Sequence, residues 1–225
     1  MGVLEILLPP ACAGCGRFGH VVCQGCVAAF RVAAAPADRF AAADPGTIVG
    51  DALELAIAAF AHKGAMRRAL QRLKYGGSGR VAVPLARAAA PALEALVQVS
   101  GSLPLVPVPV HAARLRQRGY NQALELIRAA RTFWDERATG GGVRLVVDVL
   151  RRIRDTPALG REPLPRRQAG LRGAFVVSRP VRVTGRRILI VDDVMTTGAT
   201  FSACAAVLLG AGAISGHAVA LARAQ

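Results

Sequence analysis

Apolar runs and amphipathic stretches alternate along the chain, which predicts an α/β fold. Residues 188–191 are four consecutive branched apolar residues, typical of a strand buried on both faces of a parallel sheet. His217–Ala222 fits another buried strand, and the segment 201–209 fits a helix ended by Gly210. The order of strand, loop, helix and strand predicts a mostly parallel sheet flanked by helices, with ligands bound at the carboxyl ends of the strands.

The segments before this unit add to the same architecture. Leu53–Phe60 is apolar and fits a strand, and Ala65–Tyr75 fits a helix with apolar residues on one face and arginines on the other. Further along, the pattern predicts a helix at 80–97, a strand at 103–110, a helix at 123–133, a strand at 143–150 and a return to the sheet at 173–177.

The charge balance favours anionic partners. The chain has 225 residues and a formal net charge of +15, and its only lysines are Lys63 and Lys74, so the cations are nearly all arginine. Such a balance suits nucleotides, pyrophosphate or nucleic acid, although an arginine-rich and alanine-rich composition also arises from genome composition alone. With few aromatic residues for stacking bases, the charge predicts an anion-binding protein and does not by itself predict a DNA-binding one.

The first residues do not resemble a secretory signal, because Glu5 replaces the basic segment and Pro9-Pro10 interrupts the apolar run. The segment 194–222 lacks charged residues, yet its threonines and glycines divide it into a loop, a helix, a turn and a strand. We therefore expect a cytoplasmic protein without membrane insertion.

Four of the five cysteines form two closely spaced Cys-x-x-Cys pairs. This spacing brings four thiolates within reach of one tetrahedral Zn²⁺, whereas disulfides or a redox pair are disfavoured without a secretory signal or a βαβ context. Four sulfur ligands leave no open position, so the zinc is expected to be structural. Cys204 is expected to be a small core residue. The predicted zinc ligands are Cys12, Cys15, Cys23 and Cys26.

The loop after the 188–191 strand has the chemistry of a site for a phosphorylated sugar. Backbone N–H groups at the start of the following helix suit a phosphate, and Gly198 permits close approach. Asp192 and Asp193 would repel that phosphate, but they suit vicinal hydroxyls or a hard cation such as Mg²⁺ beside it. The residues expected to contact the phosphate are Thr196, Thr197, Gly198, Ala199 and Thr200.

Two other segments are rich in arginine. The first places three arginines just before or beside Gly119, where guanidinium groups would bind a pyrophosphate or simply be solvated. The second, 151–172, holds seven arginines among glycines and prolines, and is predicted to be either disordered or a mobile lid. The lid arginines of interest are Arg152, Arg154, Arg161, Arg166 and Arg167.

Residues 188–200 resemble, position by position, the motif by which type I phosphoribosyltransferases bind phosphoribosyl pyrophosphate (PRPP). Four apolar residues, two acids, two apolar residues and Thr-Thr-Gly-x-Thr follow one another. The resemblance implies a type I phosphoribosyltransferase-like fold. It also implies that the catalytic acids Asp192 and Asp193 contact the ribose hydroxyls, that the following loop holds the 5-phosphate, and that Mg²⁺ accompanies PRPP.

The whole chain resembles the ComF family of phosphoribosyltransferase-like proteins, which are associated with DNA uptake in natural transformation. The four-cysteine segment, Lys74-Tyr75, Pro107-Val108-Pro109 and the segment 118–122 carry this resemblance together with the motif. It implies that Arg118 and Gly119 meet the pyrophosphate, and that 151–172 is the flexible lid. Within that lid, Leu159 and Gly170 depart from the usual Gln and Asn.

These patterns together suggest three segments and three competing functions. The segments are a zinc-ribbon-like module at 1–35, a linker and hood-like helical segment at 36–102, and a phosphoribosyltransferase-like core at 103–225. One expected function is binding of PRPP with Mg²⁺, with catalytic turnover an open question. Another is handling of single-stranded DNA together with DNA-uptake proteins, and the two are compatible. The alternative is a nucleobase-salvage phosphoribosyltransferase.

Overall fold

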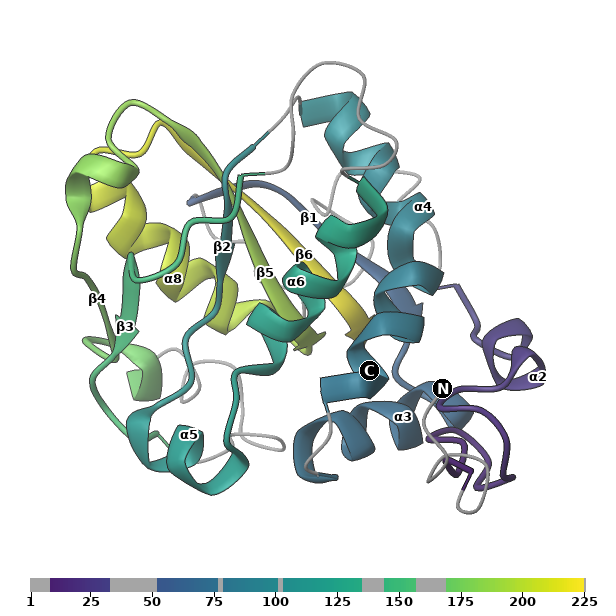
Figure 1. Ribbon diagram of the computed structural model, residues 1–225. Coiled ribbons are helices and arrows are strands. Elements are labelled where there is room, and N and C mark those ends of the chain that lie inside the picture. Colours follow the sequence, from purple (N-terminus) through teal and green to yellow (C-terminus); the bar gives the residue numbers. More distant parts are fainter. Residues whose placement is uncertain are drawn as a thin grey trace.

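A four-stranded parallel sheet forms the centre of the molecule (Figure 1). The computed structural model describes residues 9–32, 52–76, 79–100, 103–134, 144–156 and 169–224. The strand order is β1-β6-β5-β2, and every neighbouring pair is parallel, which confirms the predicted α/β class with a mostly parallel sheet. The strands are β1 (Leu53–Ala61), β2 (Leu105–Pro107), β5 (Arg187–Met195) and β6 (Ser215–Arg223).

Helices cover both faces of this sheet (Figure 1). On one face, α8 (Ala199–Gly210) packs its Phe201 and Cys204 against Ile188 and Ile190 of β5, and Cys204 is buried as predicted. On the other face, α4 (Ala82–Ser100) and α6 (Gln122–Trp134) pack against the alternate residues of β5. The continuous burial of 188–191 follows from this two-sided cover.

One part of the predicted sheet is wrong. The segment 173–177 does not return to the central sheet: β4 (Phe175–Val177) pairs antiparallel with β3 (Leu150–Arg152) in a separate two-stranded sheet. The segment 144–149 contributes only a bridge from Leu145 to Leu105 of β2. Prolines explain the short β2, because residues such as Pro107 lack the N–H group that a longer ladder needs.

Helix α3 (Gly64–Tyr75) follows β1 and begins at the carboxyl edge of the sheet. Its apolar face is buried, as the sequence predicts, and the cysteine-rich segment with α2 (Gln24–Ala28) packs on it in one shared cluster. A bridge from Val32 to Phe60 joins this segment to β1. Because β1 belongs to the central sheet, the sheet extends beyond the predicted core segment 103–225.

A short helix, α5 (Ala112–Arg118), forms where a basic loop was expected. The side chain of His111 accepts a hydrogen bond from the backbone N–H of Ala113, and Gly119 ends the helix with a left-handed φ of 82°. Single 3-10 turns, η1 (Gly79–Val81) and η2 (Pro180–Arg182), complete the described elements. None of the helices in the described ranges is long and apolar enough to span a membrane.

Candidate functional site

The two aspartates of the motif lie within β5 and have different neighbours. The strand continues through Met195, so both carboxylates lie at the carboxyl end of β5. Asp193 is buried and pairs with Lys74 of α3, whereas Asp192 acts electrostatically on Cys204 of α8 and on Arg152 as well as on Lys74. The two carboxylates therefore meet different groups but are close enough to act on each other.

Asp192 is held in an environment that disfavours its charged form. Burial, followed by the negative charge of Asp193, raises the pKa of Asp192 from 3.8 to about 8, although Lys74 acts in the opposite direction. One oxygen of Asp192 also accepts a hydrogen bond from the backbone N–H of Asp193, at 2.8 Å. A cation placed beside this carboxylate would relieve the unfavourable charge.

An ion pair joins α3 to the motif. The Lys74 Nζ atom lies 2.8 Å from Oδ2 of Asp193, and only 8% of the Asp193 side chain is exposed. Burial by itself would lower the pKa of Lys74, but the charge of Asp193 outweighs it and the pKa is raised. In the sequence, Lys74 stands out only through the resemblance to a known family, because nothing in the pattern pairs it with a distant aspartate.

The start of α8 has the geometry of an anion site. Gly198 adopts a left-handed φ of 80° at the N-cap of the helix and supplies no capping side chain, so the first N–H groups stay available. The hydroxyl of Thr197 is buried and has no hydrogen-bond partner among the residues that the structure describes. Thr196 is exposed, Ala199 is buried and Thr200 is half-buried around this turn.

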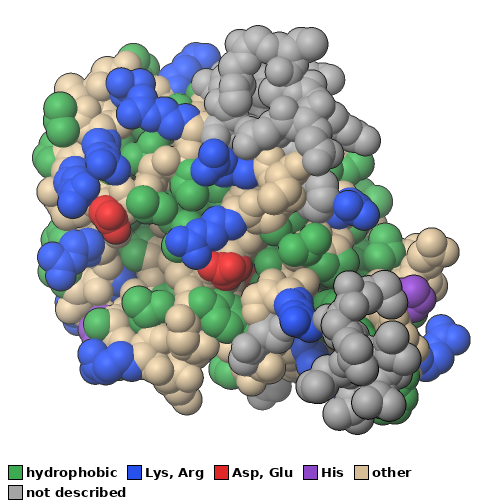
Figure 2. Space-filling model, viewed as in Figure 1, with side chains coloured by type: hydrophobic (Ala, Val, Ile, Leu, Met, Phe, Trp, Pro, Cys, Tyr) green, Lys and Arg blue, Asp and Glu red, His purple; other side chains and the backbone are tan. Residues whose placement is uncertain are grey.

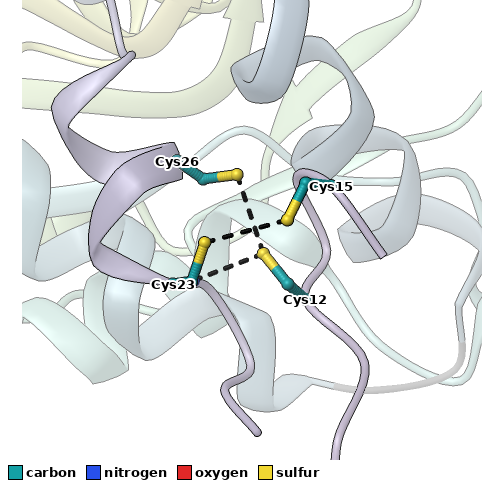
Figure 3. A group of neighbouring side chains, drawn as sticks. All are labelled: Cys12, Cys15, Cys23 and Cys26. Carbon is teal, nitrogen blue, oxygen red and sulfur yellow. Dashed lines mark hydrogen bonds between the residues drawn. The ribbon is translucent and has the colours of Figure 1, made fainter. Parts of the chain in front are cut away.

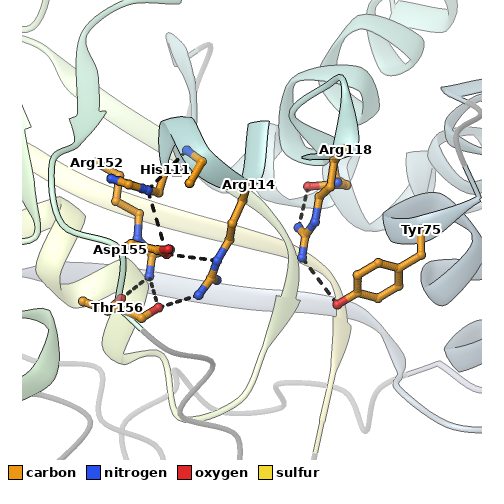
Figure 4. Close-up of polar contacts among 9 residues, drawn as sticks. Tyr75, His111, Arg114, Arg118, Arg152, Asp155 and Thr156 are labelled. Atoms are coloured by element: carbon orange, nitrogen blue, oxygen red, sulfur yellow. Dashed lines mark hydrogen bonds and ion pairs between the residues drawn. The ribbon is translucent and has the colours of Figure 1, made fainter. Parts of the chain in front are cut away.

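Arg118, the arginine predicted to meet pyrophosphate, lies beside the end of α3 (Figure 4). Its guanidinium group is 5.1 Å from the centre of the Tyr75 ring and donates at 3.4 Å to the Tyr75 hydroxyl. A second bond, at 3.3 Å, reaches Oε1 of Gln122. Arg118 also acts electrostatically on Lys74, so the basic turn and the aspartate motif meet through α3.

A second cluster of arginines anchors the segment 152–156 (Figure 4). Arg114 on α5 donates to the carbonyl oxygen of Thr156 at 2.6 Å and pairs with Asp155 at 3.2 Å. Arg152 bonds the Thr156 hydroxyl and lies over the Phe175 ring. Arg152 is thus in a strand, not in a loop as predicted, while Arg154 bonds the carbonyl of Arg172 at 2.7 Å. The lid arginines Arg161, Arg166 and Arg167 lie outside the described residues.

A cavity of about 410 Å³ adjoins the turn that contains Gly119. Its lining is mainly apolar, with Val106, Leu124 and Val146 among the lining residues, and Tyr120 contributes an aromatic ring. The volume falls in the range of sites for small organic ligands. This cavity was not foreseen from the sequence, because its lining comes from separate parts of the chain.

The four cysteines of the amino-terminal segment converge as predicted (Figure 3). All four sulfur atoms lie within 4.8 Å of one another, and two pairs, Cys12–Cys26 and Cys15–Cys23, are 3.8 Å apart. Four ligands at ~2.3 Å from a tetrahedral zinc are separated by about 3.8 Å, whereas disulfide sulfurs lie about 2 Å apart. The arrangement therefore fits a metal ion such as Zn²⁺.

Surrounding groups favour the thiolate forms of Cys12 and Cys15, whereas burial raises the pKa of Cys26 to about 12, so that this thiol is the one whose proton a metal ion has to displace. A hydrogen bond with Arg17 lowers the pKa of Cys15 to about 6. Burial would raise the pKa of Cys12, but backbone N–H groups, including those of Cys23 and Gly14 at 3.3 and 3.4 Å, lower it.

Comparison with known proteins does not identify this chain. No model of a known protein family matches the sequence, and no curated protein matches it at a significant level.

Proposed function

We propose that the carboxyl end of β5 binds PRPP together with Mg²⁺. In this proposal the turn 196–200 holds the 5-phosphate, and Asp192 and Asp193 face the ribose hydroxyls and the metal ion. Arg118 and Gly119 face the pyrophosphate. The α/β sheet supports this proposal, since open sheets of this kind bind ligands beyond the carboxyl ends of their strands.

The observation that carries the proposal is the buried Thr197 hydroxyl at the start of α8. A buried hydroxyl without a partner costs about 1–3 kcal/mol, so a ligand that bonds to it recovers this loss. The hydroxyl lies at a helix N-terminus, where the helix dipole and free N–H groups favour an anion. Two carboxylates precede it in the same strand-loop unit, which suits a phosphate on a polyhydroxyl compound.

Mg²⁺ fits the carboxylate pair because it prefers hard oxygen ligands and binds through one or two carboxylates plus phosphate oxygens. Asp193 already pairs with a cation, and the raised pKa of Asp192 shows how unfavourable its charge is without one. When bound, Mg²⁺ would neutralise charge on the pyrophosphate. Asp192 and Asp193 would orient the ribose, and Arg118 would stabilise the pyrophosphate as it departs.

Calorimetric titration tests the proposal. PRPP with excess Mg²⁺ is added to the wild type and to the Asp192→Asn, Asp193→Asn double variant. We expect saturable binding to the wild type and a loss of at least ~100-fold in the variant, the effect of removing two charged contacts. The control is Asp148→Asn, since this exposed residue has a left-handed φ of 62° that asparagine tolerates. Equal affinities, or no binding by the wild type, would refute the proposal.

Single-stranded DNA is a second candidate ligand, favoured by the exposed arginines around the β3–β4 sheet. Figure 2 shows Lys and Arg side chains gathered on the side of the molecule where β3 and β4 lie. The side chain of Arg154 donates a hydrogen bond to the backbone carbonyl of Arg172, and the side chain of Arg182 donates one to the backbone carbonyl of Val147. These two bonds join the segments 147–154 and 172–182. The exposed arginines there are Arg151, Arg154, Arg172 and Arg179.

A salt series separates DNA binding from ligand binding. Binding of a labelled single-stranded oligonucleotide should weaken steeply with salt, with a slope on a logarithmic plot near −0.7 per phosphate contacted. Replacing Arg151 and Arg172 with Ser should reduce that slope and leave PRPP binding unchanged. A flat salt response would remove this candidate, and with it the supposed association with DNA-uptake proteins.

A nucleobase-salvage phosphoribosyltransferase is the alternative, favoured by the cavity of about 410 Å³ beside Gly119. Its test is release of pyrophosphate from PRPP in the presence of purine and pyrimidine bases. Release that depends on one base would support the alternative, whereas binding of PRPP without release for any base would exclude it.

A further inference from the structure

The Lys74–Asp193 ion pair is more enclosed than three other ion pairs in the described part of the chain, Arg114–Asp155, Arg128–Glu125 and Arg187–Glu54. The side chains of Lys74 and Asp193 are 25% and 8% exposed, whereas each of the others has a partner that is about half exposed or more. An enclosed pair of this kind is costly to break, because the remaining charge would stay buried without a partner. The position of Lys74 is therefore a defined feature of the free protein.

This ion pair competes with the proposed ligand. The Lys74 ammonium occupies Oδ2 of Asp193 at 2.8 Å, and the proposed function requires the Asp193 carboxylate for a ribose hydroxyl or Mg²⁺. An ammonium group and a metal ion cannot occupy the same position on one carboxylate oxygen, since both are cations. A ligand that takes Oδ2 of Asp193 therefore has to move Lys74 away from this oxygen.

A second cation, Arg118, acts on Lys74. The positive charge of Arg118 disfavours the charge on Lys74, so the two cations lie close enough to repel each other. Arg118 is fixed by Tyr75, the residue after Lys74, and by Gln122. Two cations that lie close together, as Lys74 and Arg118 do, favour binding of a polyanion that contacts both of them.

We propose that Lys74 has two partners: Asp193 in the free protein, and an oxygen of the ligand's pyrophosphate in the complex. This inference rests on the proposed function and extends it. Lys74 thereby makes binding depend on the pyrophosphate. When a pyrophosphate oxygen becomes the partner of Lys74, the Asp193 carboxylate is free to contact the ribose and the metal ion. A ligand without pyrophosphate has to displace Lys74 without offering it another partner.

Two ligands that differ only in the pyrophosphate test this inference. PRPP and ribose 5-phosphate, each with Mg²⁺, are titrated into the wild type, Lys74→Met and Lys74→Arg. In Lys74→Met we expect PRPP to bind at least ~10-fold more weakly, the loss of one charge-assisted hydrogen bond. Ribose 5-phosphate should bind as tightly as before or more tightly, because its competitor is gone. Lys74→Arg should restore part of the PRPP affinity.

The outcomes separate the two proposals. If the wild type does not bind PRPP, the proposed function fails and this inference with it. If the wild type binds PRPP, but Lys74→Met changes the affinities of both ligands by the same factor or changes neither, only the inference about Lys74 fails. Lys63→Met is the control, since Lys63 precedes α3 at its opposite end and its loss should affect neither ligand.

A spectroscopic readout avoids dependence on the folding of the variants. The chain has only two lysines, so reductive methylation with ¹³C-formaldehyde gives two lysine signals, which Lys63→Met assigns. We expect the Lys74 signal to shift when PRPP and Mg²⁺ are added, and to shift differently with ribose 5-phosphate. A Lys74 signal that is unchanged at saturating PRPP would overturn the inference.

Discussion

Adjacent residues of β5 have opposite electrostatic surroundings. Asp193 has an ammonium group at 2.8 Å, whereas Asp192 has burial and a like charge against it, which raise its pKa to about 8. The charged form of Asp192 therefore destabilises the free protein and becomes favourable when a cationic or hydroxyl-bearing ligand arrives. Functional sites commonly carry such a cost.

The substitution Asp192→Asn should stabilise the free protein while it weakens PRPP binding. In the unfolded chain the carboxyl has a pKa near 3.8, so between that value and about 8 unfolding releases a proton. The free energy of unfolding of the wild type should therefore fall as pH rises through this window, and the loss should be complete above it. Thermal unfolding at several pH values measures this dependence. At the alkaline end, the melting temperature of the Asn variant should be at least ~2–4 °C above that of the wild type.

Two controls accompany this experiment. At pH values below the window both forms carry no charge at this position, so their melting temperatures should agree. Asp148→Asn should show the same pH dependence as the wild type. A variant that melts below the wild type at alkaline pH would contradict the prediction.

The cluster of four cysteines leaves no room for a side chain at Gly14. A Cβ atom there would lie 2.6 Å from Sγ of Cys26, which is closer than atoms approach, so Gly14→Ala should displace that ligand and reduce bound zinc. Gly25→Ala is the matched control, because its Cβ would meet only the end of the Arg17 side chain at 3.7 Å. Elemental analysis of the purified variants measures the zinc. Equal zinc in both would show that the cluster tolerates the added atom.

At the level of elements, α3 connects two sites. Its apolar face packs against the cysteine-rich segment, and Arg68 on the same helix donates a hydrogen bond to the carbonyl of Gly14. Its last residues, Lys74 and Tyr75, contact Asp193 and Arg118, and the Tyr120 hydroxyl bonds the carbonyl of Leu73. A change at the cysteine cluster can therefore reach the ligand site through one rigid helix.

The packing of α3 is tested by Leu70→Ala. Leu70 is 1% exposed in the cluster that joins the cysteine-rich segment to the core, so the cavity left behind should lower the free energy of unfolding by about 2–5 kcal/mol. Urea denaturation monitored by circular dichroism measures the loss. Arg67→Ala on the exposed face of α3 should change stability by less than ~0.5 kcal/mol. Similar losses in the two variants would mean that α3 is not held by this face.

Elements with a strong pattern were predictable, and short ones were not. The strand at 188–191 was predicted from an unbroken run of branched apolar residues, and the helix at 65–75 from apolar residues that recur on one face. The β3–β4 pair was missed because three residues on each strand carry no distinguishable period. Helix α5 was missed because three of its seven residues are arginine and none is buried, so only its capping residues marked it.

Whether a residue of the site could be predicted depended on where its partners lie in the sequence. The residues of the motif are consecutive, so their chemistry could be predicted from the chain alone. The partners of that motif are distant in sequence: Lys74 reaches Asp193, and Arg114 reaches Thr156, only after α3 and α5 are placed. Local sequence does not encode such contacts, since they depend on how separate elements pack.

At the level of the whole molecule, the metal centre should support more than its own loops. Buried Cys12 and Cys26 share one apolar cluster with Phe30, Phe60 and α3. Zinc binding in small modules supplies an apparent free energy of about 10 kcal/mol or more, and here part of it should stabilise the core through this contact.

Removal of zinc should therefore lower the melting temperature and also weaken PRPP binding. A chelator selective for zinc, used with excess Mg²⁺, leaves the second metal in place, and adding zinc back should restore both properties. Differential scanning calorimetry and repeat titration of PRPP measure the two effects. A metal-free protein that binds PRPP as tightly as the zinc form would show that α3 keeps its position without the cysteine cluster.

The contact between the cysteine-rich segment and β1 also affects solubility. β1 lies at the edge of the sheet, and the backbone N–H of Ala61 donates at 2.9 Å to the carbonyl of Arg31, next to the Val32–Phe60 bridge. Unpaired backbone groups on an edge strand invite pairing with strands of other molecules. Part of this edge is occupied by the segment that carries the four cysteines. If these cysteines bind zinc, oxidation or loss of the metal should open the edge to strand addition, and aggregation should be an early sign of metal loss.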